Sequence, residues 1–438
     1  MSAANGVRRA FVNARLVDPA SGLDAPGALL TEGGVILDLG PQLFQDGLPD
    51  DAEIIDCGGA VLAPGLVDMR VQVGEPGQEH KETIHSAGLA AAAGGVTSMV
   101  ALPNTEPVVD DVSGLEFVAR RAREEKLAKV FSYAALTRRL EGKEITEIGL
   151  LDEYGALGFT DGVKAVGDPG VMRRALAYAG AFDQLIIQHP AEPTLTGSGV
   201  MNSGELATRL GLSGLHPLTE VMMIERDLRL VEMTKGRYHV AHVSCAASLE
   251  VIRAAKAKGL AVTCDTAPHY FMLNETTVGD YRTFAKVSPP LRSEEDRAAI
   301  VEGLADGTID AIASDHCPQD QDSKRLPFAA AEFGIVGLET LLPLSLSLVH
   351  GGKLELPRLL ALLTQGPADL LKLGAGRLAR GLPADLVLID LESPWQIDTL
   401  AFRSKSKNSP FDGFPVQGRV LRTVVDGRTI YQAGPKTG

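Results

Sequence analysis

The stretch that decides the fold is Pro-Gly-Leu-Val-Asp-Met-Arg-Val-Gln-Val-Gly-Glu-Pro-Gly at residues 64–77. Two polar side chains, Arg70 and Gln72, stand two residues apart in it. Residues spaced i and i+2 on a strand point to the same face, so these two side chains share one neighbourhood. Arginine is permanently charged and offers only hydrogen-bond donors, and glutamine offers a neutral amide. The pair is therefore poorly suited to holding a cation.

Short apolar segments alternate with helical segments through the middle of the chain. The predicted strands are 97–102, 129–134, 185–188, 239–243, 261–263 and 311–313. Alternation of this kind implies a parallel sheet, because each connection between parallel strands crosses over through a helix. Over a segment as long as 61–375 it predicts a closed (β/α)8 barrel, which is an α/β fold.

Both ends of the chain carry β-rich segments of another kind. We predict strands at 9–12, 28–30, 35–39, 53–56 and 384–392, and a hairpin at 418–433. Asp426-Gly427 lies between the two runs of this hairpin and is a strong signal for its turn. We therefore expect residues 1–60 and 376–438 to form one small β-sandwich domain beside the barrel domain 61–375. The polar stretch 318–327 is expected to be a loop at the barrel mouth.

Composition argues against several classes of partner. The 438 residues carry a formal net charge of −14, which disfavours nucleic acid and anionic membrane surfaces. The sequence has no run of about 18 apolar residues, so no membrane span is expected. The four cysteines, Cys57, Cys245, Cys264 and Cys317, show no paired spacing. Because no signal peptide is visible either, we expect a reduced, cytoplasmic protein.

Seven further motifs, in order along the chain, resemble those of the dihydroorotases, a family of cyclic amidohydrolases. They are Leu-Pro-Asn-Thr-Glu-Pro at 102–107, Ile-Gln-His-Pro-Ala-Glu at 187–192, His-Val-Ser-Cys-Ala-Ala-Ser at 242–248, Thr-Cys-Asp-Thr-Ala-Pro-His at 263–269, Lys-Val-Ser-Pro-Pro-Leu-Arg at 286–292, Ala-Ser-Asp-His-Cys-Pro at 313–318 and Ser-Lys-Ser-Lys-Asn-Ser-Pro-Phe-Asp-Gly at 404–413. The stretch 64–77 is similar to the family's first metal-binding strand. Allantoinases and hydantoinases are close relatives, but the segments around 104, 289–292 and 405–413 fit dihydroorotase better.

The resemblance implies zinc-dependent interconversion of carbamoyl aspartate and dihydroorotate in pyrimidine synthesis. It implies metal ligands at His189, His242 and Asp315. Asp161 is a tentative further ligand, Asp315 is the catalytic position, and Asn104 lies in a segment that resembles the substrate loop. The residues alone leave other interpretations open: hydrogen-bonded core histidines, a salt-bridged Asp315, and an Asn104 that caps a turn.

Five positions depart from the family pattern. Arg70 and Gln72 replace the histidines of the family's His-x-His, and Gly74 replaces the arginine that holds the substrate carboxylate. Gly162 stands where the family can have a second aspartate, and Gln319 replaces a histidine. The missing arginine alone is a large loss, because a charged bidentate contact is worth roughly 1.5–3 kcal/mol.

The first hypothesis is therefore a dihydroorotase-like subunit with little or no activity that assembles with aspartate carbamoyltransferase, as inactive homologues in the family do. Its zinc is expected to be lost or reduced to one ion, with Arg70 in the vacated site paired to Asp315 or Asp161. One alternative is an active zinc dihydroorotase with a mononuclear site on His189, His242 and Asp315. Another is a pocket that binds an anion through Arg70. The resemblance also implies a homo- or hetero-oligomer.

Overall fold

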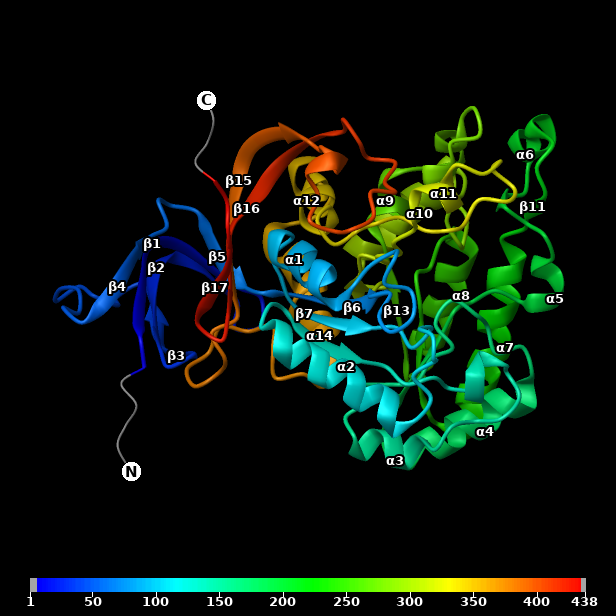
Figure 1. Cartoon of the computed structure of the whole chain (residues 1–438), viewed down its shortest axis with the longest axis horizontal. Helices are drawn as coiled ribbons and strands as arrows, with labels where there is room; N and C mark the ends of the chain where they lie inside the picture. Colours follow the sequence, from blue (N-terminus) through cyan, green and yellow to red (C-terminus); the bar gives the residue numbers. More distant parts are fainter. Residues whose placement is uncertain (1–5, 435–438) are drawn as a thin grey trace.

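The computed structural model describes residues 6–434. The strands of its larger domain are β6 (Leu66–Val71), β7 (Val96–Ala101), β8 (Lys129–Ser132), β9 (Leu185–Gln188), β12 (Arg237–Val240), β13 (Val262–Thr266) and β14 (Ala311–Ile312). They form two parallel sheets, β6–β7–β8 and β9–β12–β13–β14 (Figure 1). Backbone bridges at Phe159 join the two sheets on one side, and a bridge from Val71 to His316 closes the ring on the other. The predicted (β/α)8 barrel is confirmed, with the segment around Phe159 in the place of its fourth strand.

Helices follow the strands and cover the outside of the ring. The longer ones are α1 (Ile84–Ala93), α2 (Val112–Glu125), α4 (Pro169–Gly180), α7 (Leu218–Thr234), α8 (Ala246–Ala257), α10 (Glu294–Ala305), α12 (Leu341–His350) and α13 (Leu356–Leu363). Shorter ones are α3 (Ile148–Glu153), α5 (Pro193–Thr196), α6 (Glu205–Leu210), α9 (Pro268–Met272), α11 (Gln321–Lys324) and α14 (Gln365–Leu370). The local sequence fixes where several helices begin. Asp168 caps α4 before Pro169, and Ser293 caps α10 before an acidic first turn.

The smaller domain is an eight-stranded sheet built from both ends of the chain. Its strands are β1 (Arg8–Asp18), β2 (Leu23–Glu32), β3 (Val35–Gly40), β4 (Ala52–Asp56), β5 (Val61–Pro64), β15 (Leu386–Gln396), β16 (Pro415–Val425) and β17 (Arg428–Gln432). β5 lies between β1 and β15, so residues 61–64 belong to this sheet and not to the barrel. The predicted hairpin is β16–β17. Asp426 and Gly427 both have positive φ, 46° and 71°, as a tight hairpin turn needs.

The two domains share a packed boundary, at which α1 and α12 lie against β16 (Figure 1). Thr423 on β16 donates a hydrogen bond to the carbonyl of Ala92 at the end of α1, 2.7 Å away. The stretch 318–327, predicted to be a loop, contains the short helix α11, because Asp320 caps its first turn through the amide of Ser323.

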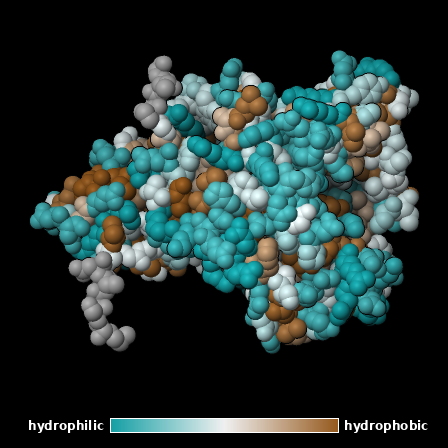
Figure 2. All heavy atoms as spheres, viewed as in Figure 1, coloured by the Kyte–Doolittle hydropathy of each residue, from teal (hydrophilic) through white to brown (hydrophobic). Residues whose placement is uncertain are grey.

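Two surface properties bear on possible partners. None of the helices described in the structure is long and apolar enough to cross a membrane. Figure 2 shows hydrophobic side chains gathered over the end of the smaller domain that carries β1–β4. The large hydrophobic residues exposed there are Val7, Val35, Leu37, Leu48 and Ile54.

Candidate functional site

Arg70 lies near the end of β6 and points into the barrel mouth. Its side chain is 3% exposed, and its Nε donates to Oδ1 of Asp315 at 2.8 Å. Its Nη2 donates to the carbonyl oxygen of Gly162 at 3.2 Å. The predicted pairing of Arg70 with Asp315 is confirmed, and the alternative pairing with Asp161 is wrong. A guanidinium thus binds the carboxylate that the family resemblance assigns to a metal.

Asp161 is hydrogen-bonded to a neighbouring loop. Its carboxylate accepts a hydrogen bond from the backbone amide of Thr137 at 2.8 Å and another from the Thr137 hydroxyl. The amide of Gly142 donates to the same hydroxyl at 2.9 Å. Burial raises the pKa of Asp161 to about 6. The carboxylate therefore anchors the loop 137–142, which explains its burial without a metal.

His189 and His242 face each other across the mouth. Nδ1 of His189 and Nε2 of His242 are 3.0 Å apart, and both rings are buried. Burial, together with the charge of Arg70, lowers the pKa of His189 to about 3 and that of His242 well below its usual value. Both imidazoles are consequently neutral at pH 7, so one ring donates its proton to the lone pair of the other.

Backbone strain marks two of these positions. His242 has φ 39° and Asp315 has φ 49°, a left-handed region that residues other than glycine rarely adopt. Such conformations cost about 1–3 kcal/mol each and cluster at functional sites. At His242 the strain is held by Asp265, whose Oδ1 accepts from the His242 amide at 2.6 Å. Asp265 also holds the buried His239 ring at 2.9 Å.

His269 also lies beside Asp315, although the sequence did not single it out as a site residue. Its Nε2 lies 3.8 Å from Oδ2 of Asp315, and burial lowers its pKa to about 3. Burial raises the pKa of Asp315 to about 6, while Arg70 works in the opposite direction. The available signal was position: His269 follows β13 within three residues, at the edge where Asp315 follows β14.

The outer part of the mouth is closed by an amide pair. Nδ2 of Asn104 donates to Oε1 of Gln72 at 3.0 Å. The cavity between them, which Gly74, Lys81 and others also line, has a volume of about 10 Å³. Such a space holds about one water molecule. Asn104 therefore lies at the mouth with its amide bonded to Gln72, and its role as a substrate contact stays a prediction.

Gly74 and Gln319 have structural explanations. Gly74 has φ 68°, and a Cβ there would lie 2.5 Å from the carbonyl oxygen of Glu82, so any side chain forces this turn to move. Gln319 makes two hydrogen bonds with other segments of the chain. Its backbone amide donates to Oδ1 of Asn408 at 3.0 Å, and its side-chain Nε2 donates to the carbonyl of Phe333 at 2.8 Å. The backbone around positions 74 and 319 is therefore arranged to fit a glycine and a glutamine.

Arg70 stands against a zinc centre at Asp315 in this arrangement. Within residues 6–434, no group of three or more His, Cys, Asp or Glu side chains is placed to hold a metal ion. Arg70 brings a fixed positive charge onto Asp315, where a cation would need the carboxylate. The ligand roles of His189, His242, Asp315 and Asp161 stay predictions. The chemistry that the residues display is a neutral imidazole pair beside an arginine–aspartate ion pair.

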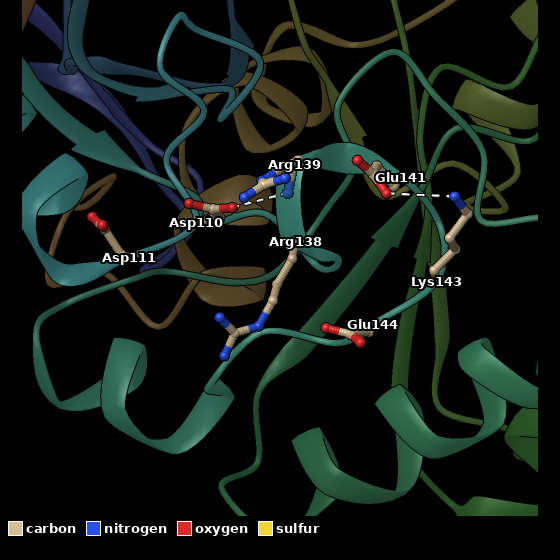
Figure 3. A pocket seen from close by; sticks show the side chains of 7 residues that line it. All are labelled: Asp110, Asp111, Arg138, Arg139, Glu141, Lys143 and Glu144. Carbon is tan, nitrogen blue, oxygen red and sulfur yellow. Dashed lines mark hydrogen bonds and ion pairs between the residues drawn. The ribbon is translucent and has the colours of Figure 1, made fainter.

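A larger hollow lies outside this cluster, among the loops after β7 and β8 (Figure 3). Its volume is about 500 Å³, and it is lined only by charged residues: Asp110, Asp111, Arg138, Arg139, Glu141, Lys143 and Glu144. The amide of Arg139 donates to Asp110 at 2.8 Å. Because both signs of charge alternate around it and no apolar wall is present among these residues, the hollow offers little to a ligand beyond water and salt.

Comparisons with known proteins agree with the motifs. The sequence model of a family described as dihydro-orotase-like matches residues 59–248. A dihydroorotase from Anaplasma phagocytophilum is 47% identical over 430 residues, covering 97% of this chain and 95% of the relative. A dihydroorotase from the Wolbachia of Drosophila simulans is 49% identical over 427 residues, covering 97% and 96%.

Solved structures agree with the fold. An L-hydantoinase from Arthrobacter aurescens superposes with a TM-score of 0.86 at 26% identity, covering 98% of this chain and 97% of its own. A dihydropyrimidinase from Brevibacillus agri superposes with a TM-score of 0.84 at 21% identity, covering 97% and 95%. The second likeness bears on the fold alone.

Proposed function

Because the chain belongs to the dihydroorotase family of amidohydrolases, whose place is pyrimidine biosynthesis, we propose that it keeps the family's barrel without its zinc-dependent hydrolysis. In this proposal it acts as a subunit that assembles with aspartate carbamoyltransferase. The single observation that carries the loss of hydrolysis is the buried ion pair between Arg70 and Asp315. Removing one partner from such a pair costs several kcal/mol, so the metal cannot displace the arginine cheaply.

Two further features support the same conclusion. Gln72 and Asn104 are hydrogen-bonded to each other at the outer mouth, and the space beside them holds about one water molecule, so the amide pair would have to separate for a substrate to occupy that space. Gly74 offers no side chain where the family resemblance places a carboxylate clamp. Metal binding, substrate entry and substrate anchoring are therefore all impaired, and by different residues.

Assembly is supported by the surface of the smaller domain. Exposed hydrophobic residues gather at its β1–β4 end, among them Leu48 and Ile54, which are 49% and 43% exposed (Figure 2). Contiguous exposed hydrophobic surface commonly marks a protein interface. Ile54 lies on the short strand β4, whose outer edge is a further place for contact.

Complementation tests the loss of catalysis. The chain is expressed in a strain that lacks dihydroorotase, beside an Asp315→Ala variant, and the purified protein is analysed for zinc. We expect no growth without added pyrimidine and less than one zinc ion per chain. Growth that disappears in Asp315→Ala would instead establish the mononuclear enzyme, and two tightly held zinc ions per chain would refute the proposal.

Co-purification tests the assembly. The chain is co-expressed with the aspartate carbamoyltransferase of the same genome, and the mass of the product is measured by light scattering after gel filtration. We expect a joint complex that Ile54→Asp weakens at least tenfold. Met233→Asp is the matched control, because Met233 is 67% exposed on α7, on the barrel domain. Separate elution of the two proteins at micromolar concentration would contradict the assembly.

A further inference from the structure

A third cavity lies at the boundary between the two domains, away from the residues of the barrel mouth. Its volume is about 400 Å³. Its walls come from α12, from the end of β15 and the short helix η4 (Thr399–Ala401), and from β16 and β17. Ligand sites in proteins typically measure about 300–1,000 Å³ and occur often between domains. The cavity therefore has the size and the place of a small-molecule site.

Aromatic and apolar groups make up much of its wall. Trp395, Phe402 and Tyr431 line it together with Pro343. The indole N–H of Trp395 already donates to the carbonyl of Gly418 at 3.0 Å. What Trp395 can still offer a ligand is consequently the face or edge of its ring. Aromatic side chains favour flat partners, by offset or edge-to-face stacking.

One cationic side chain, that of Arg419, lines the cavity. Nε of Arg419, on β16, is buried and makes no hydrogen bond. Because Nε is enclosed, an acceptor in the cavity would instead meet Nη1 and Nη2 of this half-buried side chain, which make no hydrogen bond or ion pair with a described residue. The carboxyl group of Glu339, also in the wall, accepts from the backbone amides of Arg403 and Ser404 at 2.6 and 3.1 Å. The other carboxylate in the wall, Asp398, accepts from the amide of Leu400 at 3.0 Å, so both acids have donors and Arg419 is the group that an anionic acceptor from outside would meet.

We propose that this cavity binds a small planar aromatic or heteroaromatic carboxylate. The ring lies against Trp395 and Tyr431, and the carboxylate accepts from Arg419. A carboxylate suits the site because a guanidinium offers it parallel donors, and a flat ring suits it because the side walls are aromatic. The site is independent of the proposed function, since the two share no lining residue.

The experiment uses the intact protein and its own fluorescence. Trp395 is the only tryptophan of the 438 residues, so a change in tryptophan emission reports on this cavity alone. Nicotinate and benzoate serve as probes. Nicotinamide has the same ring without the charge, and cyclohexanecarboxylate has the charge without the flat ring. Calorimetry under the same conditions gives a second measure of each Kd.

We expect saturable quenching by nicotinate and benzoate, with at least tenfold weaker binding of nicotinamide and cyclohexanecarboxylate. Arg419→Gln should weaken nicotinate at least tenfold, and Arg419→Lys should restore part of the affinity. Arg422→Gln is the matched control: Arg422 is on the same strand, outside the cavity, and donates to Thr429 at 2.9 Å.

Three results would overturn the site. One is the lack of saturable binding of either carboxylate up to 10 mM, by fluorescence and by calorimetry. The second is equal affinity of the natural protein for nicotinate and nicotinamide. This comparison uses no variant, so it does not depend on a variant folding. The third is a Kd that Arg419→Gln leaves unchanged. Failure here leaves the complementation result untouched, so the two proposals fall separately.

Discussion

The two halves of the barrel mouth differ in how well they keep the family pattern. At the ends of β9, β12 and β14, the residues are those the resemblance leads one to expect, His189, His242 and Asp315. At the end of β6, Arg70 and Gln72 replace the expected pair of histidines. Yet the backbone at His242 and Asp315 still has the rare left-handed conformation, with φ of 39° and 49°.

The difference teaches that a barrel can keep the geometry of a site after the chemistry of one wall has changed. Arg70 supplies the positive charge that the buried Asp315 needs, and the two neutral imidazoles share one hydrogen bond, which leaves Nδ1 of His242 unpaired. Each strained residue thus has a neighbouring side chain bonded to it: Asp315 has Arg70, and His242 has His189 and Asp265.

Arg70→Leu should have the largest effect. It leaves Asp315 buried without its partner, and breaking a buried ion pair in this way costs about 3–5 kcal/mol. We expect the urea midpoint to fall accordingly. Arg173→Leu on α4 is the control, because Arg173 is exposed and its loss should change stability by about 0.5 kcal/mol or less.

A second change separates charge from packing. Asp315→Asn removes the negative charge and keeps a side chain that tolerates positive φ. The double variant Arg70→Leu with Asp315→Asn should be more stable than Arg70→Leu alone. If the two single effects simply add, the ion pair does not hold this half of the mouth together.

The pH dependence of His189→Gln should come next. The pKa of His189 is lowered to about 3 in the folded protein, so its contribution to stability is full above about pH 6.5 and is lost as the pH falls. Between pH 6 and 4, the stability of the natural protein relative to His189→Gln should fall by roughly 1 kcal/mol per pH unit.

Asp315 acts in the opposite sense, because its pKa is raised to about 6 and its contribution is lost as the pH rises. It is present in both proteins, so it cancels from the difference. Denaturant unfolding at four pH values measures this difference. A constant difference would mean that His189 is protonated alike in the folded and unfolded chains, and that it faces solvent.

The turn at Gly74 offers a matched pair of glycines. Gly74 and Gly142 both have φ 68°, but a Cβ meets the Glu82 carbonyl at 2.5 Å only at Gly74, and nothing within 4 Å at Gly142. Gly74→Ala should therefore destabilise the protein by roughly 1–3 kcal/mol more than Gly142→Ala, as overpacking does. Equal thermal midpoints would show that the turn yields easily and could accept an arginine.

The fold could be predicted from the sequence because the patterns that indicate it are periodic and repeated. Alternation of apolar strands with helices predicted the barrel, and Asp426-Gly427 predicted the β16–β17 hairpin of the smaller domain. The pairing of Arg70 with Asp315 was also within reach, since a buried carboxylate needs a partner. The helix within 318–327 was missed, because a single capped turn leaves little pattern in a polar stretch.

The tertiary contacts of the site were harder to predict. The sequence could not show that Asp161 would turn to Thr137, because that bond depends on the path of a neighbouring loop. His269 was missed for a similar reason: its distance from Asp315 follows from the strand order β13–β14, which no local pattern contains. Side-chain partners across a barrel are set by the register of its strands.

The smallest expected effect lies at the outer mouth, in the bond between Asn104 and Gln72. A single hydrogen bond between uncharged side chains contributes about 0.5–1.5 kcal/mol. A double-mutant cycle with Asn104→Ala and Gln72→Ala should give a coupling energy in this range, measured by urea unfolding. Because the pair is partly exposed, water replaces each lost partner and keeps the value low. Zero coupling would mean that the mouth is open in solution, and that Asn104 is free to contact a ligand.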